Sequence, residues 1–295
     1  MRKIELLSPA KNLECGKAAV LHGADAVYIG APKFGARAAA GNSIQDIEQL
    51  AAFAHRFDAR VYAALNTILT DSELEEAQRL IWNLYHAGAD AVIVQDMGIL
   101  QLDLPPIALH ASTQTDNRTA EKARFLEKAG FSQIVLAREL SLTEIKNITS
   151  QVQIPVEVFV YGALCVSYSG QCYLSHALGS RSANRGECAQ CCRLPYNLVD
   201  ANGNILAKNK YLLSLKDLNL SDYLEELLDA GVSSFKIEGR LKDMAYVKNV
   251  TAFYRQKLDE ILDNKNSSLT NQPAMTKSSS GKITYFFQPD VQKTF

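Results

Sequence analysis

One phrase occurs twice in the chain, as His22-Gly23-Ala24-Asp25-Ala26-Val27 and as His86-Ala87-Gly88-Ala89-Asp90-Ala91-Val92. In each copy a helical pattern ends at a glycine, and an apolar run begins at once. Weaker copies are present at residues 128–131 and 229–232. Glycine readily adopts the left-handed backbone conformation that ends a helix. Four such helix–glycine–strand junctions predict βα units with right-handed crossovers and a parallel sheet.

Eight short apolar runs rich in β-branched residues are predicted to be strands: residues 4–7, 26–29, 60–65, 91–94, 107–110, 133–136, 156–160 and 233–237. Segments with helical periodicity separate the first seven. Eight strands that alternate with helices predict an α/β fold, a TIM-like (β/α)8 barrel. An open doubly wound sheet is the alternative. The chain has no Gly-x-Gly-x-x-Gly after its first strand, which argues against dinucleotide binding.

The alternation is interrupted once, after the seventh strand, by a Cys-rich insertion at about residues 161–232. A final amphipathic helix over 243–262 would complete a barrel region of residues 1–262. Residues 263–281 are rich in Asn, Ser, Thr and Lys and are predicted to be a flexible linker. Residues 282–288 have the pattern of a strand, and we interpret 282–295 as the start of a truncated C-terminal region.

The composition is that of a globular protein. Of the 295 residues, 47% are hydrophobic and 21% charged, which excludes a disordered chain. The formal net charge of −1 gives no global sign of nucleic-acid binding. No run of apolar residues is long enough to predict a membrane span, and residues 1–9 lack the core of a secretory signal. The expected location is the cytoplasm, where thiols stay reduced.

Polar residues follow most of the predicted strands. The loops at this end of a barrel carry the active site, so we predict a functional pocket there. Gln95, Ser112 and Lys236 belong to this polar ring. The candidates to bind a substrate or an anionic co-substrate are Arg37, Asn66, Gln114, Arg138, Glu238 and Arg240. Arginine suits this role because its planar fork binds carboxylates and phosphates bidentately.

The insertion holds five of the six cysteines. Cys165, Cys172, Cys188 and Cys192 follow one another at intervals of seven, sixteen and four positions. Clustered thiols in a reduced compartment indicate zinc or an iron–sulfur cluster, and their chemistry leaves both open. Cys191 and Cys192 are adjacent, so only one of them is expected to be a ligand. Cys15, on the first helix, is predicted to be a buried apolar residue.

The insertion also has a local excess of positive charge. Between residues 181 and 210 the basic residues are Arg181, Arg185, Arg193, Lys208 and Lys210, and the acidic ones are Glu187 and Asp200. An RNA backbone would be attracted to such a surface. An ordinary solvated loop has the same pattern.

Long motifs around the cysteines resemble the signature of the collagenase-like peptidase family U-32. They are Glu157-Val158-Phe159-Val160-Tyr161-Gly162-Ala163-Leu164-Cys165, Ser169-Gly170-x-Cys172 and Asn184-Arg185-Gly186-x-Cys188. Residues 5–10, 23–30 and 236–240 are similar to further family blocks, and the likeness covers about residues 4–262. Better understood members of this family are oxygen-independent hydroxylases with a 4Fe-4S cluster on four cysteines. Some act on a pyrimidine at carbon five, with prephenate implicated, and others act on the ubiquinone ring.

The chain is most similar to the branch that forms 5-hydroxycytidine in large-subunit ribosomal RNA; a related branch forms 5-hydroxyuridine in tRNA. The resemblance implies ribosomal RNA or tRNA as partner. It implies Cys165, Cys172, Cys188 and Cys192 as ligands of the cluster, with prephenate as co-substrate. Members usually have Pro before the last ligand, where this chain has Cys191. Cys191 therefore stays an alternative to Cys192.

Two other functions are weighed against the hydroxylase. The family name suggests a protease, but the chain has no His-Glu-x-x-His and no Gly-x-Ser-x-Gly motif. A cysteine protease would pair one thiol with His110 or His176, which leaves the other thiols unexplained. A zinc-stapled RNA-binding scaffold accounts for the cysteines but not for the polar ring. The sequence gives no indication of the oligomeric state.

Overall fold

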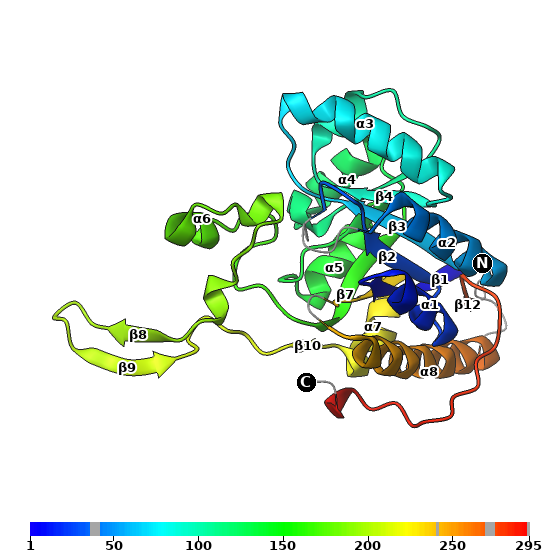
Figure 1. Cartoon of the computed structure of the whole chain (residues 1–295). Coiled ribbons are helices and arrows are strands. Elements are labelled where there is room, and N and C mark those ends of the chain that lie inside the picture. Colours follow the sequence, from blue (N-terminus) through cyan, green and yellow to red (C-terminus); the bar gives the residue numbers. More distant parts are fainter. Residues whose placement is uncertain (36–41, 240–241, 269–274, 294–295) are drawn as a thin grey trace.

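The structure is a computed structural model that describes residues 1–35, 42–239, 242–268 and 275–293. Eight parallel strands form a closed barrel: β1 (Arg2–Ala10), β2 (Ala26–Gly30), β3 (Arg60–Leu65), β4 (Ala91–Val94), β5 (Ala108–Ala111), β6 (Gln133–Val135), β7 (Val156–Gly162) and β11 (Ser234–Ile237). The ring closes because β6 pairs with β7 and β11 lies between β7 and β1. The predicted TIM-like (β/α)8 barrel and its eight strands are confirmed (Figure 1).

Seven helices surround the described part of the barrel: α1 (Leu13–Leu21), α2 (Ile44–Ala54), α3 (Asp71–His86), α4 (Ala120–Lys128), α5 (Leu142–Thr149), α7 (Leu224–Asp229) and α8 (Met244–Ser268). Helix α3 illustrates how the sequence specifies them. Thr70 and Glu73 form a capping box at its start, and Leu80 and Leu84 are buried on one face. Buried residues of the helices and the outward side chains of the strands form the main core.

The glycines of the repeated phrase have the predicted conformation. Gly23, Gly88, Gly130 and Gly231 have φ values of +105°, +85°, +100° and +98°. The aspartate of the phrase fastens the neighbouring strand, because Asp25 Oδ2 accepts a hydrogen bond from the amide of Leu6 at 2.8 Å. Asp90 Oδ2 accepts one from the amide of Val61 at 2.7 Å. The phrase therefore encodes both the end of a helix and the attachment of the next strand.

The chain between β7 and β11 extends away from the barrel (Figure 1). It contains α6 (Leu174–Gly179), short 3₁₀ turns at Ala183–Arg185 and Cys191–Arg193, and an antiparallel hairpin of β8 (Tyr196–Val199) and β9 (Ile205–Lys210). Strand β10 (Leu218–Asn219) returns to pair antiparallel with the end of β7. The five clustered cysteines lie in this segment, ahead of β8.

The C-terminal part differs from the prediction. Helix α8 continues to Ser268, beyond the expected end at residue 262, and β12 (Met275–Lys277) pairs in parallel with Arg2–Ile4 of β1. The described residues of the predicted linker 263–281 thus include a helix end and a strand. The strand predicted at 282–288 is wrong, since these residues are irregular.

Side-chain contacts fasten the irregular C-terminal segment to the barrel. The hydroxyl of Tyr285 donates to the carbonyl oxygen of His22 at 3.2 Å, and that of Tyr161 donates to the carbonyl oxygen of Val291 at 2.8 Å. The division at residue 282 remains a prediction. Among the described residues, no helix has the length and apolar character that crossing a bilayer requires.

Candidate functional site

The register of three strands places polar side chains level with one another at the C-terminal mouth of the barrel. Residues 64 of β3, 93 of β4 and 110 of β5 are paired neighbours. Paired residues point to the same face of a sheet, and so does the second residue after each of them. Asn66, Gln95 and Ser112 therefore follow their strands at one level inside the barrel mouth.

Hydrogen bonds join these residues to Gln114 in an amide cluster. Gln114 Nε2 donates to the carbonyl oxygen of Asn66 at 2.9 Å, and Gln95 Nε2 donates to the carbonyl oxygen of Gln114 at 3.1 Å. Asn66 Nδ2 lies 3.4 Å from Ser112 Oγ. The structure thus brings together the predicted site residues Asn66 and Gln114, and it adds Gln95 to them.

Cations and an aromatic ring lie across the mouth, on β6, β7 and β11. Arg138 forms an ion pair with Glu238 at 2.9 Å and also donates to the carbonyl oxygen of Ala163 at 2.9 Å. Its guanidinium carbon lies 3.9 Å from the centre of the Phe159 ring, and Lys236 Nζ lies 5.3 Å from the same centre. The predicted residues Arg138 and Glu238 are therefore direct partners. An anionic ligand of Arg138 would compete with the Glu238 carboxylate. The other two predicted site residues, Arg37 and Arg240, lie outside the described residues.

A polar network fills the barrel interior below the mouth. Glu157 is fully buried and accepts hydrogen bonds from Lys236 at 2.7 Å, Gln133 at 2.6 Å and Ser234 at 3.3 Å. The Ser234 hydroxyl oxygen also lies 2.7 Å from a Glu5 carboxylate oxygen, so its single proton is shared between the two glutamates. The sequence analysis did not select the two glutamates. The signal was present, because each stands alone between apolar residues of a strand.

Burial shifts the acidity of two groups in this interior. It raises the pKa of Glu5 to about 7, and the Glu157 charge adds to the increase while a hydrogen bond from Tyr62 opposes it. It lowers the pKa of His110 to about 3, and the charge of Lys236 contributes. His110 is therefore neutral at physiological pH and packs edge-on against the Tyr62 ring.

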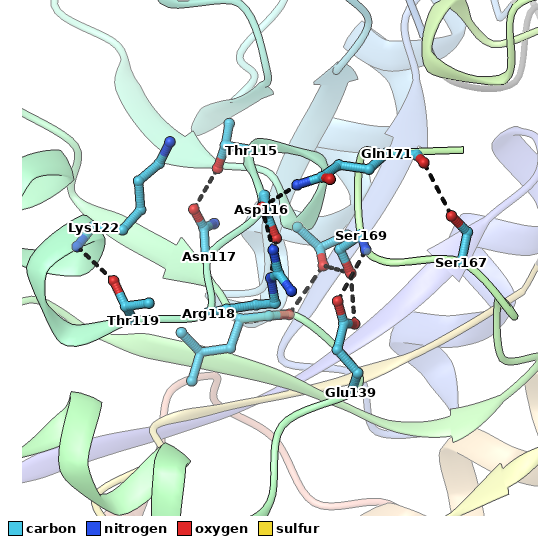
Figure 2. A network of polar contacts seen from close by, with 12 residues as sticks. Thr115, Asp116, Asn117, Arg118, Thr119, Lys122, Glu139, Ser167, Ser169 and Gln171 are labelled. Carbon is cyan, nitrogen blue, oxygen red and sulfur yellow. Dashed lines mark hydrogen bonds and ion pairs between the residues drawn. The ribbon is translucent and has the colours of Figure 1, made fainter. Parts of the chain in front are cut away.

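The loop from Cys165 to Cys172 is docked on the loops that follow β5 and β6 (Figure 2). The amide and hydroxyl groups of Ser169 each lie 3.0 Å from the Glu139 carboxylate, to which they donate. Gly170 has a φ of +73°, and a Cβ built on it would lie 2.0 Å from the carbonyl oxygen of Gln114. This close approach requires glycine and places the loop directly against the amide cluster.

A second anchor holds the segment before Cys188. Arg185 forms an ion pair with Glu73 at 2.7 Å and donates to the carbonyl oxygen of Ile68 at 2.8 Å. The hydrogen bond from Arg185 lowers the pKa of Glu73 to about 2, with help from the Thr70 amide. Residues 183–185 are thereby attached to the loop between β3 and α3.

A third anchor holds the segment around Cys192. Arg193 donates to the carbonyl oxygen of Leu164, which precedes Cys165, and to that of Leu215 at 2.8 Å. This anchor joins the segment around Cys192 to the start and the end of the insertion.

Three of the five basic residues that the sequence analysis named in this segment make contacts within the chain. Arg185 and Arg193 are occupied by internal contacts, and Arg181 donates to the carbonyl oxygen of Glu187 at 3.1 Å. Lys208 and Lys210 on β9 are exposed. Arg181 and Arg185 are exposed as well, and an RNA surface on this segment stays a prediction.

Cys192 is close enough to the other three predicted ligands to respond to their charges. Burial raises the pKa of its thiol, and the charges of Cys165, Cys188 and Cys172 raise it further. Cys191 is buried, with 8% of its surface exposed, and the choice between Cys191 and Cys192 stays a prediction. Cys15 is buried in α1, as predicted.

The four thiols have the composition that zinc and iron–sulfur clusters need. Their arrangement differs from that of a formed site, because the part of the chain that the structure describes holds no group of three or more His, Cys, Asp or Glu placed to bind a metal ion. We therefore derive no reaction step through a bound metal.

Comparison with known proteins gives close relatives. The chain is 57% identical over 293 residues to the Escherichia coli K12 protein named 23S rRNA 5-hydroxycytidine C2501 synthase. The alignment covers 99% of this chain and 44% of that protein. It is 36% identical over 268 residues to tRNA hydroxylation protein P1 of Bacillus subtilis 168, covering 88% of this chain and 64% of the relative. It is 31% identical over 271 residues to a collagenase of Porphyromonas gingivalis W83, and this alignment covers 86% of this chain and 65% of the collagenase. The chain thus spans less than half the length of the E. coli relative.

Solved structures share the fold. Thiamine phosphate pyrophosphorylase from Pyrococcus furiosus matches 88% of this chain and 98% of its own with a TM-score of 0.51 and 14% identity. A U32 peptidase matches 80% of this chain and 93% of its own with a TM-score of 0.51 and 15% identity. A family model described as peptidase family U32 matches residues 11–294, which confirms the resemblance found in the motifs. The chain belongs to peptidase family U32.

Proposed function

We propose that the chain holds the catalytic barrel of an iron–sulfur-dependent, oxygen-independent RNA hydroxylase that forms 5-hydroxycytidine in large-subunit ribosomal RNA. The observation that carries this proposal is the 57% identity, over 99% of the chain, to a relative whose name states that product. The polar barrel mouth supports it, since the loops after the strands of such a barrel bind substrates. A ribosomal substrate implies a cytoplasmic enzyme.

The proposed cofactor is a 4Fe-4S cluster on Cys165, Cys172, Cys188 and Cys192. Thiolates are the usual ligands of such clusters, and the three anchored segments direct these four thiols to one face of the barrel. When bound, a cluster would supply redox chemistry at this face. Zinc is the alternative for the same donors.

Prephenate is the proposed co-substrate. Its carboxylates need cations, and Arg138 and Lys236 lie near one ring at the barrel mouth. Arg138 would exchange the carboxylate of Glu238 for one of the ligand. The Glu238 side chain, with 8% of its surface exposed, would lose the contact with Arg138 in that exchange.

Metal analysis of anaerobically purified protein tests the cofactor. We expect iron and acid-labile sulfide at about four of each per chain. Cys192→Ala should lose them, whereas Cys191→Ala, the matched change at the neighbouring position, should keep them. A stoichiometric zinc signal without iron would favour the zinc-stapled scaffold instead.

Nucleoside analysis tests the reaction. Deleting the gene should remove 5-hydroxycytidine from large-subunit ribosomal RNA, and the complete gene should restore it. Loss of 5-hydroxyuridine from tRNA instead would assign the reaction suggested by the B. subtilis relative. If Arg138→Ala leaves every RNA modification intact in a folded protein, the scaffold is the better account.

The name of the P. gingivalis relative favours proteolysis as a second candidate. His110 would be a poor general base, because burial lowers its pKa to about 3. Gelatin cleavage that persists with chelators and is abolished by replacing one cysteine would establish this activity.

A further inference from the structure

We propose that Gln95 recognises the exocyclic amino group of the target cytosine. This inference rests on the proposed function, and it adds the residue that distinguishes cytosine from uracil. Gln95 follows β4 inside the barrel mouth, and only 8% of its surface is exposed to solvent. Gln95 belongs to the amide cluster with Asn66, Ser112 and Gln114.

The orientation of the Gln95 amide is fixed by its one hydrogen bond. Nε2 donates to the carbonyl oxygen of Gln114 at 3.1 Å. Turning the amide over would place Oε1 against that carbonyl oxygen, and two acceptors repel each other. The nitrogen is therefore engaged, and the oxygen is the group left for a ligand.

The Gln95 oxygen has no partner among the residues that the structure describes, although it is buried. A buried acceptor without a donor is destabilising, so such groups are nearly always satisfied by protein, water or ligand. The missing group must be a hydrogen-bond donor. An uncharged donor fits best, since the amide cluster itself carries no formal charge.

A cytosine base supplies that donor. Its N4 amino group donates hydrogen bonds, whereas uracil carries an accepting oxygen at the same position. Enzymes that modify a base rotate it out of its stack and read its edge by hydrogen bonds in the pocket. The position suits the chemistry, because the Gln114 carbonyl oxygen that fixes Gln95 also contacts Gly170 in the loop between Cys165 and Cys172.

Binding of three short RNAs to the full-length protein tests the proposal. They carry cytidine, uridine or pyrimidin-2-one ribonucleoside at the target position; the last lacks the amino group and adds no bulk. The unaltered protein should bind the cytidine RNA about tenfold more tightly than either of the others. Equal binding of the three would overturn the proposal, as expected if a water molecule satisfies Gln95. This arm requires no variant to fold.

Gln95→Met should bind all three RNAs equally, because methionine keeps the size of glutamine and removes its acceptor. Gln101→Met, the same change at an exposed position, should keep the preference. Retained discrimination in Gln95→Met would refute the role of this residue. If 5-hydroxycytidine forms but the protein binds the three RNAs equally, the inference about Gln95 fails and the proposed function stands. If the protein prefers the cytidine RNA but no hydroxylated product forms, the proposed function fails.

Discussion

Replacing Lys236 with methionine should destabilise the barrel far more than the loss of a surface charge would. Its ammonium nitrogen lies 2.7 Å from Glu157 Oε1. The exposed fraction of the side chain is 6% for Lys236 and 0% for Glu157. Without Lys236, the Glu157 carboxylate would stay buried with only the neutral donors Gln133 and Ser234.

The size of the effect follows from burial. Breaking a buried ion pair by removing one partner costs about 3–5 kcal/mol. Glu157 keeps its hydrogen bonds to Gln133 and Ser234, so Lys236→Met should lower the free energy of unfolding by an amount at the lower end of this range, about 3 kcal/mol. An unfolding entropy of about 2.1 cal/mol/K per residue gives roughly 0.6 kcal/mol/K for a chain of this length. The midpoint of thermal unfolding should therefore fall by about 5 °C.

Thermal and urea unfolding of two matched variants checks this reasoning. Lys257 pairs with Asp222 at a similar distance, 2.8 Å, but these side chains retain 35% and 83% of their exposure. Lys257→Met should change stability by at most about 1 kcal/mol. Adding Glu157→Gln to Lys236→Met should recover part of the loss, since no buried charge remains. Equal midpoints for Lys236→Met and Lys257→Met would refute the assigned role of burial.

Three further changes have defined outcomes. Gly170→Ala should displace the loop from the barrel and increase its cleavage by protease, whereas Gly203→Ala, also at positive φ (+86°) but with open space around it, should leave the loop protected. Burial raises the pKa of Glu5 to about 7, so the folded state favours the protonated carboxyl. The stability that this protonated group contributes is fully present below pH 4.5 and is lost as the pH rises through 7. Urea unfolding should therefore show the unaltered protein losing about 3 kcal/mol relative to Glu5→Gln across that window; parallel pH profiles would contradict this. Arg185→Met should return the pKa of Glu73 from about 2 toward its ordinary value, measured by NMR titration, and an unchanged pKa would mean that the ion pair does not form in solution.

The barrel could be predicted from the sequence because its signals are local. Gly23 and Gly88 end helices within one turn, and Asp25 and Asp90 bind the backbone of the strand beside them. Each of these features depends on neighbours that the repeated phrase itself implies. The error at residues 282–288 has the opposite origin. Their strand pattern is local, but a strand forms only where the segment reaches a partner strand, and this segment is held to the barrel by side-chain contacts such as that of Tyr285.

The candidate site was only half predictable, for a related reason. Asn66, Gln114, Arg138 and Glu238 were found because they follow strands, yet their pairing depends on register and on loops from distant segments. Gln95 belonged to the predicted ring without a reason to single it out. What distinguishes it is a buried oxygen that finds no donor among the described residues, a property that depends on the placement of distant segments.

The register also divides the barrel mouth into two chemically different halves. Among the described residues, the ends of β3, β4 and β5 supply neutral amides and a hydroxyl, whereas Arg138 after β6, Phe159 on β7 and Lys236 on β11 supply cations and an aromatic ring. A neutral base edge is read by amides, and a carboxylate is bound by cations. Because the proposed reaction needs both a pyrimidine and an anionic co-substrate, the two halves match its two ligands. The docked loop between Cys165 and Cys172 approaches the amide half through Gly170.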